Sequence, residues 1–203
     1  AGTGRQSCQR DQRLQSRPRH GRAVPAVRRC AGLAHHRRRP HRGARGGALS
    51  KVSLAAILPR LDGFSLATAK DFAGHSPDSP IVMMQIRNGA PLPEAQRLER
   101  IYRLQVADPE GERQGDGLVR YSFRQDSGYR AQELFTGAID GQQTVILCDR
   151  VAADTPEPNC LRDVPFGNGL GLSYRFKRAH LARWREIDTA VRGRVNGFIE
   201  RNN

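Results

Sequence analysis

The chain has 203 residues, and its 34 basic and 20 acidic residues give a formal net charge of +14. This length accommodates one domain with a tail, and it excludes a large multidomain enzyme. No stretch approaches the roughly 20 apolar residues that a transmembrane helix requires. Taken alone, the basic excess points to nucleic acid or an anionic membrane surface as the partner.

The charge is concentrated in the first quarter of the chain. Residues 1–47 contain 13 arginines, no lysine and one acidic residue, Asp11, whereas residues 48–203 carry 21 basic and 19 acidic residues, a net charge of +2. The first segment also lacks Phe, Tyr, Trp, Ile and Met, so it cannot bury enough apolar area to offset the entropy lost on ordering. We therefore predict a disordered Arg-rich segment at 1–47 and a single domain at 48–203.

Four interpretations of the Arg-rich segment compete. The run Arg37–Arg39 could anchor a basic arm that binds RNA or DNA, although no aromatic residue is present for base stacking. A targeting peptide would need an uninterrupted apolar or an amphipathic stretch, and arginines surround the candidate metal ligands His35, His36 and His41. We favour the fourth interpretation, in which the segment is out of frame or otherwise non-native. The 31 arginines against three lysines indicate a GC-rich coding sequence, whose native frame would begin near Ala48.

The beginning of the folded part has no single interpretation. The segment 51–58 fits either a short helix or an entering strand, and the segment 64–72 fits either a helical turn or an extended piece. The apolar run 81–86 has the length of a strand. After it, Pro93 begins a short helical turn, and an alternating pattern predicts a strand at about 100–107.

Strand patterns are strongest between residues 118 and 177. The runs 118–123 and 170–177 alternate apolar and polar residues, as half-buried strands do. We predict two further strands, at 129–137 and 143–148, on either side of the hairpin signal Asp140-Gly141. The short connections favour antiparallel pairing, because a parallel pair needs a long crossover.

The last segment of the chain has the clearest helical pattern. Its apolar residues recur at steps of three and four, namely Leu181, Trp184, Ile187, Val191, Val195 and Phe198. Such a stripe predicts an amphipathic helix, and an antiparallel sheet needs a cover on one face. We therefore predict an α+β fold, in which an antiparallel sheet of about five strands is packed by this C-terminal helix.

Cys148 and Cys160 are the two cysteines outside the Arg-rich segment, and a polar, Pro-rich loop separates them. We predict that they form a disulfide, which would stabilise the fold by about 3 kcal/mol, with two unrelated thiols as the alternative. A disulfide points to a periplasmic or other extracytoplasmic compartment, with the cytoplasm as the alternative. Neither His75 nor His180 has metal-ligand spacing with these cysteines, so we predict no metal site.

Glycines and one histidine offer weaker candidates for chemistry. Gly167, Gly169 and Gly171 resemble part of a dinucleotide-binding motif, but a strand follows them instead of a helix, so we predict a turn or bulge and no cofactor. His180 lies at the start of the predicted helix, where a packed, hydrogen-bonded histidine is the favoured interpretation. The enzyme alternative would combine it with Asp188, or with Glu186 or Glu133 (the other nearby acids). We predict no catalytic residue.

Basic residues on the predicted strands allow a further hypothesis. They could form one basic sheet face, made of Arg120, Arg124, Arg130, Arg175 and Lys177. Such a face would bind nucleic acid, phospholipid headgroups or an acidic protein. We favour a normal solvated face instead, because the acidic residues Glu112, Asp126 and Glu133 lie close in sequence and the region is nearly neutral.

The functional prediction depends mainly on the disulfide. We predict a non-enzymatic bacterial domain that is exported or membrane-tethered and acts through a protein or cell-envelope partner. The first alternative is a nucleic-acid-binding protein that uses the basic N-terminal arm. The second is an enzyme with a site near His180.

Overall fold

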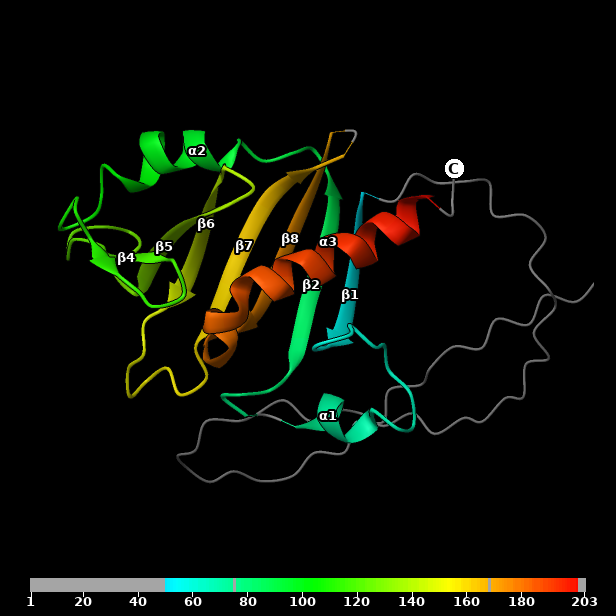
Figure 1. Cartoon of the computed structure of the whole chain (residues 1–203). Helices are drawn as coiled ribbons and strands as arrows, with labels where there is room; N and C mark the ends of the chain where they lie inside the picture. Colours follow the sequence, from blue (N-terminus) through cyan, green and yellow to red (C-terminus); the bar gives the residue numbers. More distant parts are fainter. Residues whose placement is uncertain (1–49, 75, 168, 201–203) are drawn as a thin grey trace, which may run out of the picture. The chain divides into compact units, whose positions relative to one another are not determined.

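The computed structural model of the chain describes residues 50–74, 76–167 and 169–200. The Arg-rich segment 1–47, with the predictions made for it, lies outside these residues. Within them, eight strands form one antiparallel sheet in the order β1-β2-β8-β7-β6-β5-β4-β3 (Figure 1). The strands are β1 (Lys51–Ile57), β2 (Ile81–Asn88), β3 (Glu112–Arg113), β4 (Val119–Ser122), β5 (Gln132–Ile139), β6 (Gln142–Asp149), β7 (Asn159–Phe166) and β8 (Leu170–Lys177).

Helical segments lie between and after these strands. They are α1 (Ala69–Ala73), α2 (Glu94–Arg97), the π-helical turn η1 (Leu98–Tyr102), the 3₁₀ segment η2 (Arg178–Arg183) and α3 (Trp184–Glu200). The predicted α+β class is confirmed, and so is the C-terminal helix. The sheet is larger than the predicted five strands, because the ambiguous segment 51–58 forms a strand and because β3 and β7 were not predicted.

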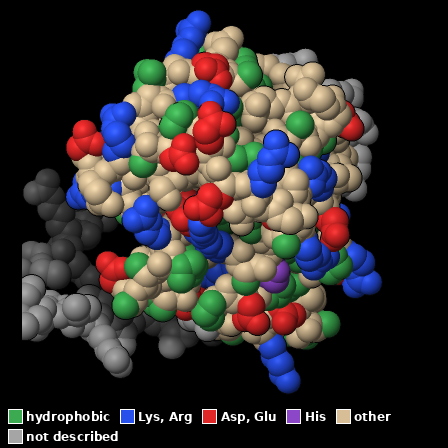
Figure 2. All heavy atoms as spheres, turned by 60° about the vertical axis from the view of Figure 1, so that its left-hand side comes forward, with side chains coloured by type: hydrophobic (Ala, Val, Ile, Leu, Met, Phe, Trp, Pro, Cys, Tyr) green, Lys and Arg blue, Asp and Glu red, His purple; other side chains and the backbone are tan. Residues whose placement is uncertain are grey.

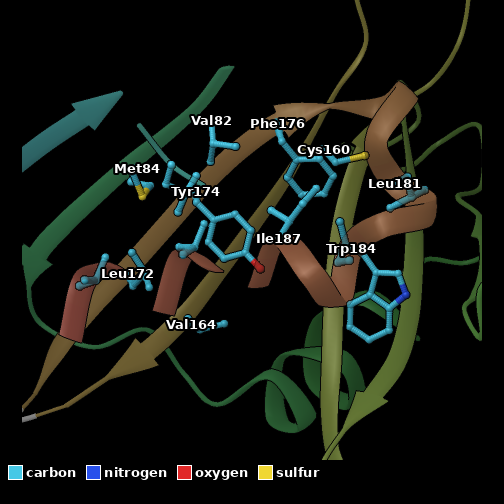
Figure 3. Close-up of a cluster of buried hydrophobic side chains, with 14 of the residues drawn as sticks. Val82, Met84, Cys160, Val164, Leu172, Tyr174, Phe176, Leu181, Trp184 and Ile187 are labelled. Carbon is cyan, nitrogen blue, oxygen red and sulfur yellow. The ribbon is translucent and has the colours of Figure 1, made fainter. Parts of the chain in front are cut away.

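The helix α3 lies across one face of β1, β2, β8 and β7 (Figure 1). Its apolar stripe is buried as predicted, with Trp184, Ile187, Val191 and Val195 at most 1% exposed. Figure 3 shows Trp184 and Ile187 among side chains of β2, β7 and β8, and these belong to the same core cluster. Burial of each such side chain contributes roughly 1.5–3 kcal/mol before entropy is counted.

A second apolar cluster covers the opposite face at the other end of the sheet. Leu98 and Tyr102 of η1 pack on side chains of β4, β5 and β6. The strand predicted at about 100–107 is therefore wrong. Leu98 and Tyr102 are buried one turn apart in η1, and Val106 forms only an isolated bridge with Phe123. Leu104, which suggested the alternation, is 64% exposed.

Turns connect the strands where the sequence predicted them. Asp140 and Gly141 both have positive φ, at 49° and 73°, which is the conformation that a two-residue hairpin turn between β5 and β6 requires. Gly167 and Gly169 also have positive φ and lie in the turn between β7 and β8. The glycine-rich segment thus forms a hairpin turn and precedes a strand.

Candidate functional site

The connection between β6 and β7 is narrow for two strands of eight residues each. Only Leu147 with Leu161 and Cys148 with Cys160 are paired in register, whereas β7 and β8 are paired along their whole length. A disulfide joins Cys148 to Cys160 at this junction. Because both cysteines are fully buried, the bond forms part of the core beneath α3.

A glutamate side chain enters the sheet beyond this junction. The buried carboxylate of Glu94, from the start of α2, accepts a hydrogen bond from the backbone N–H of Val145 at 2.8 Å, where β6 has no partner on β7. It also accepts bonds from Nε and Nη2 of Arg162 on β7, at 3.0 and 2.9 Å. Glu94 thus replaces the missing ladder between the two strands, and the buried backbone N–H is satisfied.

Arg162 links this carboxylate to α3. Its guanidinium forms an ion pair with Asp188, which also accepts hydrogen bonds from the Tyr174 hydroxyl at 2.9 Å and from Nε of Arg192. Glu94, Arg162, Tyr174 and Asp188 are all buried. We call these four residues and Arg192 the buried charge network.

A pocket of about 370 Å³ lies against the buried charge network. Its two carboxylates are balanced by two guanidinium groups, and each polar group already has a partner within the protein. No group of metal ligands occurs among the described residues. The network therefore offers no unbonded base or nucleophile to the pocket, and its geometry is that of a structural link between α2, the sheet and α3.

Burial determines how this network responds to alkaline pH. Burial raises the pKa of the Tyr174 hydroxyl above its ordinary value of 10.0, the charge of Asp188 raises it further, and Arg162 opposes the shift. For Arg162, burial alone would lower the pKa, but the bond to Glu94 and the nearby acidic groups outweigh it and raise the pKa. The folded protein thus holds Tyr174 neutral and Arg162 charged.

We expect alkaline destabilisation that depends on Tyr174. Folding raises the pKa of the Tyr174 hydroxyl, so the folded state holds this proton more tightly than the unfolded state does. The contribution of Tyr174 to the free energy of unfolding is therefore fully present below pH 10. Above pH 10 it falls by up to about 1.4 kcal/mol per pH unit. Denaturant unfolding of the native chain and of Tyr174→Phe at pH 8 to 11 measures this. The variant should show a smaller loss above pH 10, and equal losses in both proteins would contradict the assignment.

His180 takes the packed position rather than a catalytic one. Its Nε2–H donates to the backbone carbonyls of Asp78 and Ser79, at 3.0 and 3.1 Å, which attaches η2 to the segment before β2. Asp188 belongs to the buried charge network, and Glu133 pairs with Arg178. The third proposed acid, Glu186, pairs with Arg183. Among the described residues, then, His180 is hydrogen-bonded to none of the three proposed acids.

The five basic residues singled out in the sequence do not form one face. The register places Arg120 on the same side of the sheet as α3, whereas Arg175 and Lys177 are on the opposite side. Arg120 pairs with Glu112 and Glu133, and Arg124 with Asp126, which are the acids predicted to neutralise them. Figure 2 likewise shows basic and acidic side chains interspersed over the surface in view.

No described helix covers one part of the sheet, namely the face of β1, β2, β8 and β7 opposite α3. We call it the open face, and it consists of the odd-numbered residues of these four strands, since the register pairs odd with odd positions throughout. Its odd-numbered residues include four basic side chains, Lys51, Arg87, Arg175 and Lys177, and one acidic side chain, Asp163. Of these, Lys177 pairs with Glu157 from the loop before β7. The net charge of +3 on the open face exceeds the +2 of residues 48–203 together.

Small residues leave a hollow in the open face. Ser53 and Ser173 line it, together with Met83, Leu161 and Arg175, and its volume is about 380 Å³. Met83 is 51% exposed, although it lies within the apolar run 81–86. No ion pair joins Arg175 to a carboxylate of the described residues, so this guanidinium is available at the edge of the hollow.

Two arginines converge on one acid elsewhere in the open face. Arg87 reaches across β8 to Asp163, with Nη2 3.0 Å from Oδ2, and Arg97 from α2 lies 3.7 Å from the same atom. The crossing requires Gly171, because a Cβ there would lie 2.8 Å from Nη1 of Arg87 and 2.9 Å from the carbonyl oxygen of Gly89. The cluster keeps a net positive charge despite its ion pairs.

An apolar patch continues from the open face onto the segment before it. Phe72 of α1 and Met83 line the same second hollow, of about 260 Å³. The ring of Phe72 contacts that of Phe64, with centroids 5.6 Å apart, and Phe64 is 70% exposed. Leu66, two residues further along the chain, is also exposed. Large exposed apolar residues gathered in this way mark interaction surfaces.

Comparison with known proteins provides a likeness of fold. No protein-family model matches the chain, and no curated protein matches it. No described helix is both long and apolar enough to cross a membrane. Among solved structures, the chain is similar to Smlt3025, an immunity protein of the Stenotrophomonas maltophilia type IV secretion system. The TM-score is 0.50 at 15% sequence identity, over 72% of this chain and 81% of that chain. At this identity the likeness shows a shared fold.

Proposed function

We propose that this domain acts by binding a protein partner and not by catalysis, and that the partner binds on the open face. The observation that carries the proposal is the half-exposed Met83 beside Arg175, in a hollow on a face of net charge +3. The fold shared with an immunity protein supports the same conclusion, because such a protein acts by binding a partner toxin. The disulfide supports an oxidising compartment outside the cytoplasm.

The charges of the open face specify the chemistry of the partner. An acidic side chain would pair with Arg175, and an apolar side chain beside it would pack on Met83 and extend the contact toward Phe64. Complementary charge steers such an encounter and selects among partners, while the apolar contact supplies most of the affinity. We therefore expect an acidic protein surface with an apolar centre.

The test uses the full chain with its disulfide intact. Affinity capture from an extract of the source organism, followed by mass spectrometry, identifies candidate partners, and each is then purified and titrated by calorimetry. Arg175→Glu should weaken binding at least tenfold, and Met83→Lys should weaken it similarly, because each places a wrong group at the centre of the contact.

A matched control makes the same charge change elsewhere. Arg113 is exposed on β3, at the opposite edge of the sheet, so Arg113→Glu should bind as the native chain does. If Arg113→Glu weakens binding as much as Arg175→Glu does, binding depends on the net charge of the chain and not on the open face. That result would overturn the proposed binding face. The proposal is also overturned if none of the captured proteins, once purified, binds in a way that depends on Arg175.

A further inference from the structure

We infer that the partner adds a β-strand to the exposed edge of β1, so that its backbone continues the sheet while its side chains reach the open face. This inference rests on the proposed function, and it specifies how the partner binds. β1 is the terminal strand of the sheet order, and no described strand pairs with its outer edge. Strand addition of this kind is a recurring mode of peptide recognition.

The hydrogen bonds of β1 show which backbone groups face outward. Asn88 N–H donates to the carbonyl of Ser50, and Leu58 N–H donates to that of Pro80, so the even-numbered residues of this segment pair with β2. In an antiparallel ladder the odd-numbered residues then direct their N–H and C=O groups away from β2. Ser53, on this edge, also lines the hollow of the open face, so the edge and the face form one surface.

The exposed edge has a defined length. At its end, Ile57 exchanges hydrogen bonds with Asp62, at 2.9 and 3.2 Å, which closes the outward groups of Ile57. The outward groups of Lys51, Ser53 and Ala55 have no partner among the described residues. Three such residues accommodate about five residues of an antiparallel strand, since alternate positions are bonded. Natural proteins protect such edges with charged side chains, proline, a bulge or a cover. Within Lys51–Ile57, the side chain of Lys51 is the one protection of these kinds.

Charge favours a different protein over a second copy of this chain. Two copies joined in an antiparallel manner through β1 would place two open faces, each of net charge +3, side by side on one surface. Like charges in that arrangement repel. An acidic strand would instead place a carboxylate beside Lys51, and the residues that adjoin this strand in the partner would lie over β2 and β8 and reach Arg175. This agrees with the partner chemistry proposed above.

The decisive variant is Ser53→Pro. Proline removes the outward N–H of Ser53 and leaves the bonds between β1 and β2 intact, and edge strands tolerate it at such a position. With the purified partner, Ser53→Pro should weaken binding at least tenfold. Ser53→Ala loses the same hydroxyl but keeps the N–H, so Ser53→Pro should bind at least tenfold more weakly than Ser53→Ala. Thermal unfolding reports whether Ser53→Pro folds, and Ala55→Pro, which removes the next outward N–H, is the second variant.

The outcomes separate this inference from the proposed function. If Arg175→Glu weakens binding and both proline variants bind normally, strand addition is overturned and the open face stands. If Arg175→Glu also binds normally, the proposed binding at the open face is overturned, and the inference that rests on it is overturned with it. A second copy of this chain is the other candidate for the edge of β1, and light scattering of the free chain tests it. If the free chain is a dimer and Ser53→Pro makes it a monomer, a second copy binds the edge, and the inference is overturned.

Discussion

Arg162→Met is expected to lower the free energy of unfolding by about 3–5 kcal/mol, the range measured when one partner of a buried ion pair is removed. The substitution leaves the carboxylates of Glu94 and Asp188 buried, at 8% and 2% exposure, without the cation that both contact. It also breaks the link that joins β7 to α2 and α3. Urea unfolding at pH 7, followed by the fluorescence of Trp184, measures the loss.

An exposed arginine provides the matched control for this variant. Arg103 pairs with Glu99 one helical turn away, and both side chains are largely exposed, so Arg103→Met should change stability by less than about 1 kcal/mol. A triple variant that also neutralises Glu94 and Asp188 should recover part of the loss, because no unpaired charge remains buried. A loss for Arg162→Met as small as that for Arg103→Met would contradict the buried charge network.

Loss of the disulfide is expected to destabilise the fold by about 3 kcal/mol, as estimated for a loop of this length. The bond joins Cys148 and Cys160, 12 residues apart in sequence, where only two residue pairs connect β6 to β7. For a domain of this size, such a loss lowers the melting temperature by about 6–12 °C. Calorimetry of the native chain with and without reductant measures the shift.

The variant Cys148→Ala/Cys160→Ala controls for effects of the reductant on the other two cysteines. Cys8 and Cys30 remain in it, so any effect of reductant on its melting temperature belongs to those residues and is subtracted. The double variant without reductant should melt at or below the temperature of the reduced native chain, since it also loses two buried sulfur atoms. An unchanged melting temperature on reduction of the native chain would show that the bond contributes no stability.

Much of the sheet could be predicted because alternation and helical periodicity are local signals. The pattern at 170–177 corresponds to β8, and the apolar stripe of the last segment corresponds to α3. β7 could not be predicted, because Arg162, Asp163 and Pro165 interrupt its apolar pattern. Arg162 is buried only through distant partners, and Pro165 lies where β7 has no neighbour on β6. These residues are tolerated in a strand because of tertiary contacts, and a local sequence pattern carries no information about such contacts.

The candidate site was less predictable than the fold. The sequence shows Arg175 and Lys177 as outward residues of a strand, but not that they share a face with Arg87 of a distant strand. Met83 lies in a continuous apolar run, which is typical of a strand buried on both sides. Its exposure follows from the position of α3, which covers only one side of β2. The topology decides which apolar residue is left for a partner.

Oxidation of the two methionines tests the open face most directly. The chain contains only Met83 and Met84, and the first is 51% exposed whereas the second is 2% exposed. Peroxide should convert Met83 to the sulfoxide much faster than Met84 in the free chain, as tandem mass spectrometry resolves. In the complex with the partner, Met83 should react at least tenfold more slowly while Met84 stays unreacted. Oxidation of Met83 at the same rate in the complex and in the free chain would contradict binding at the open face.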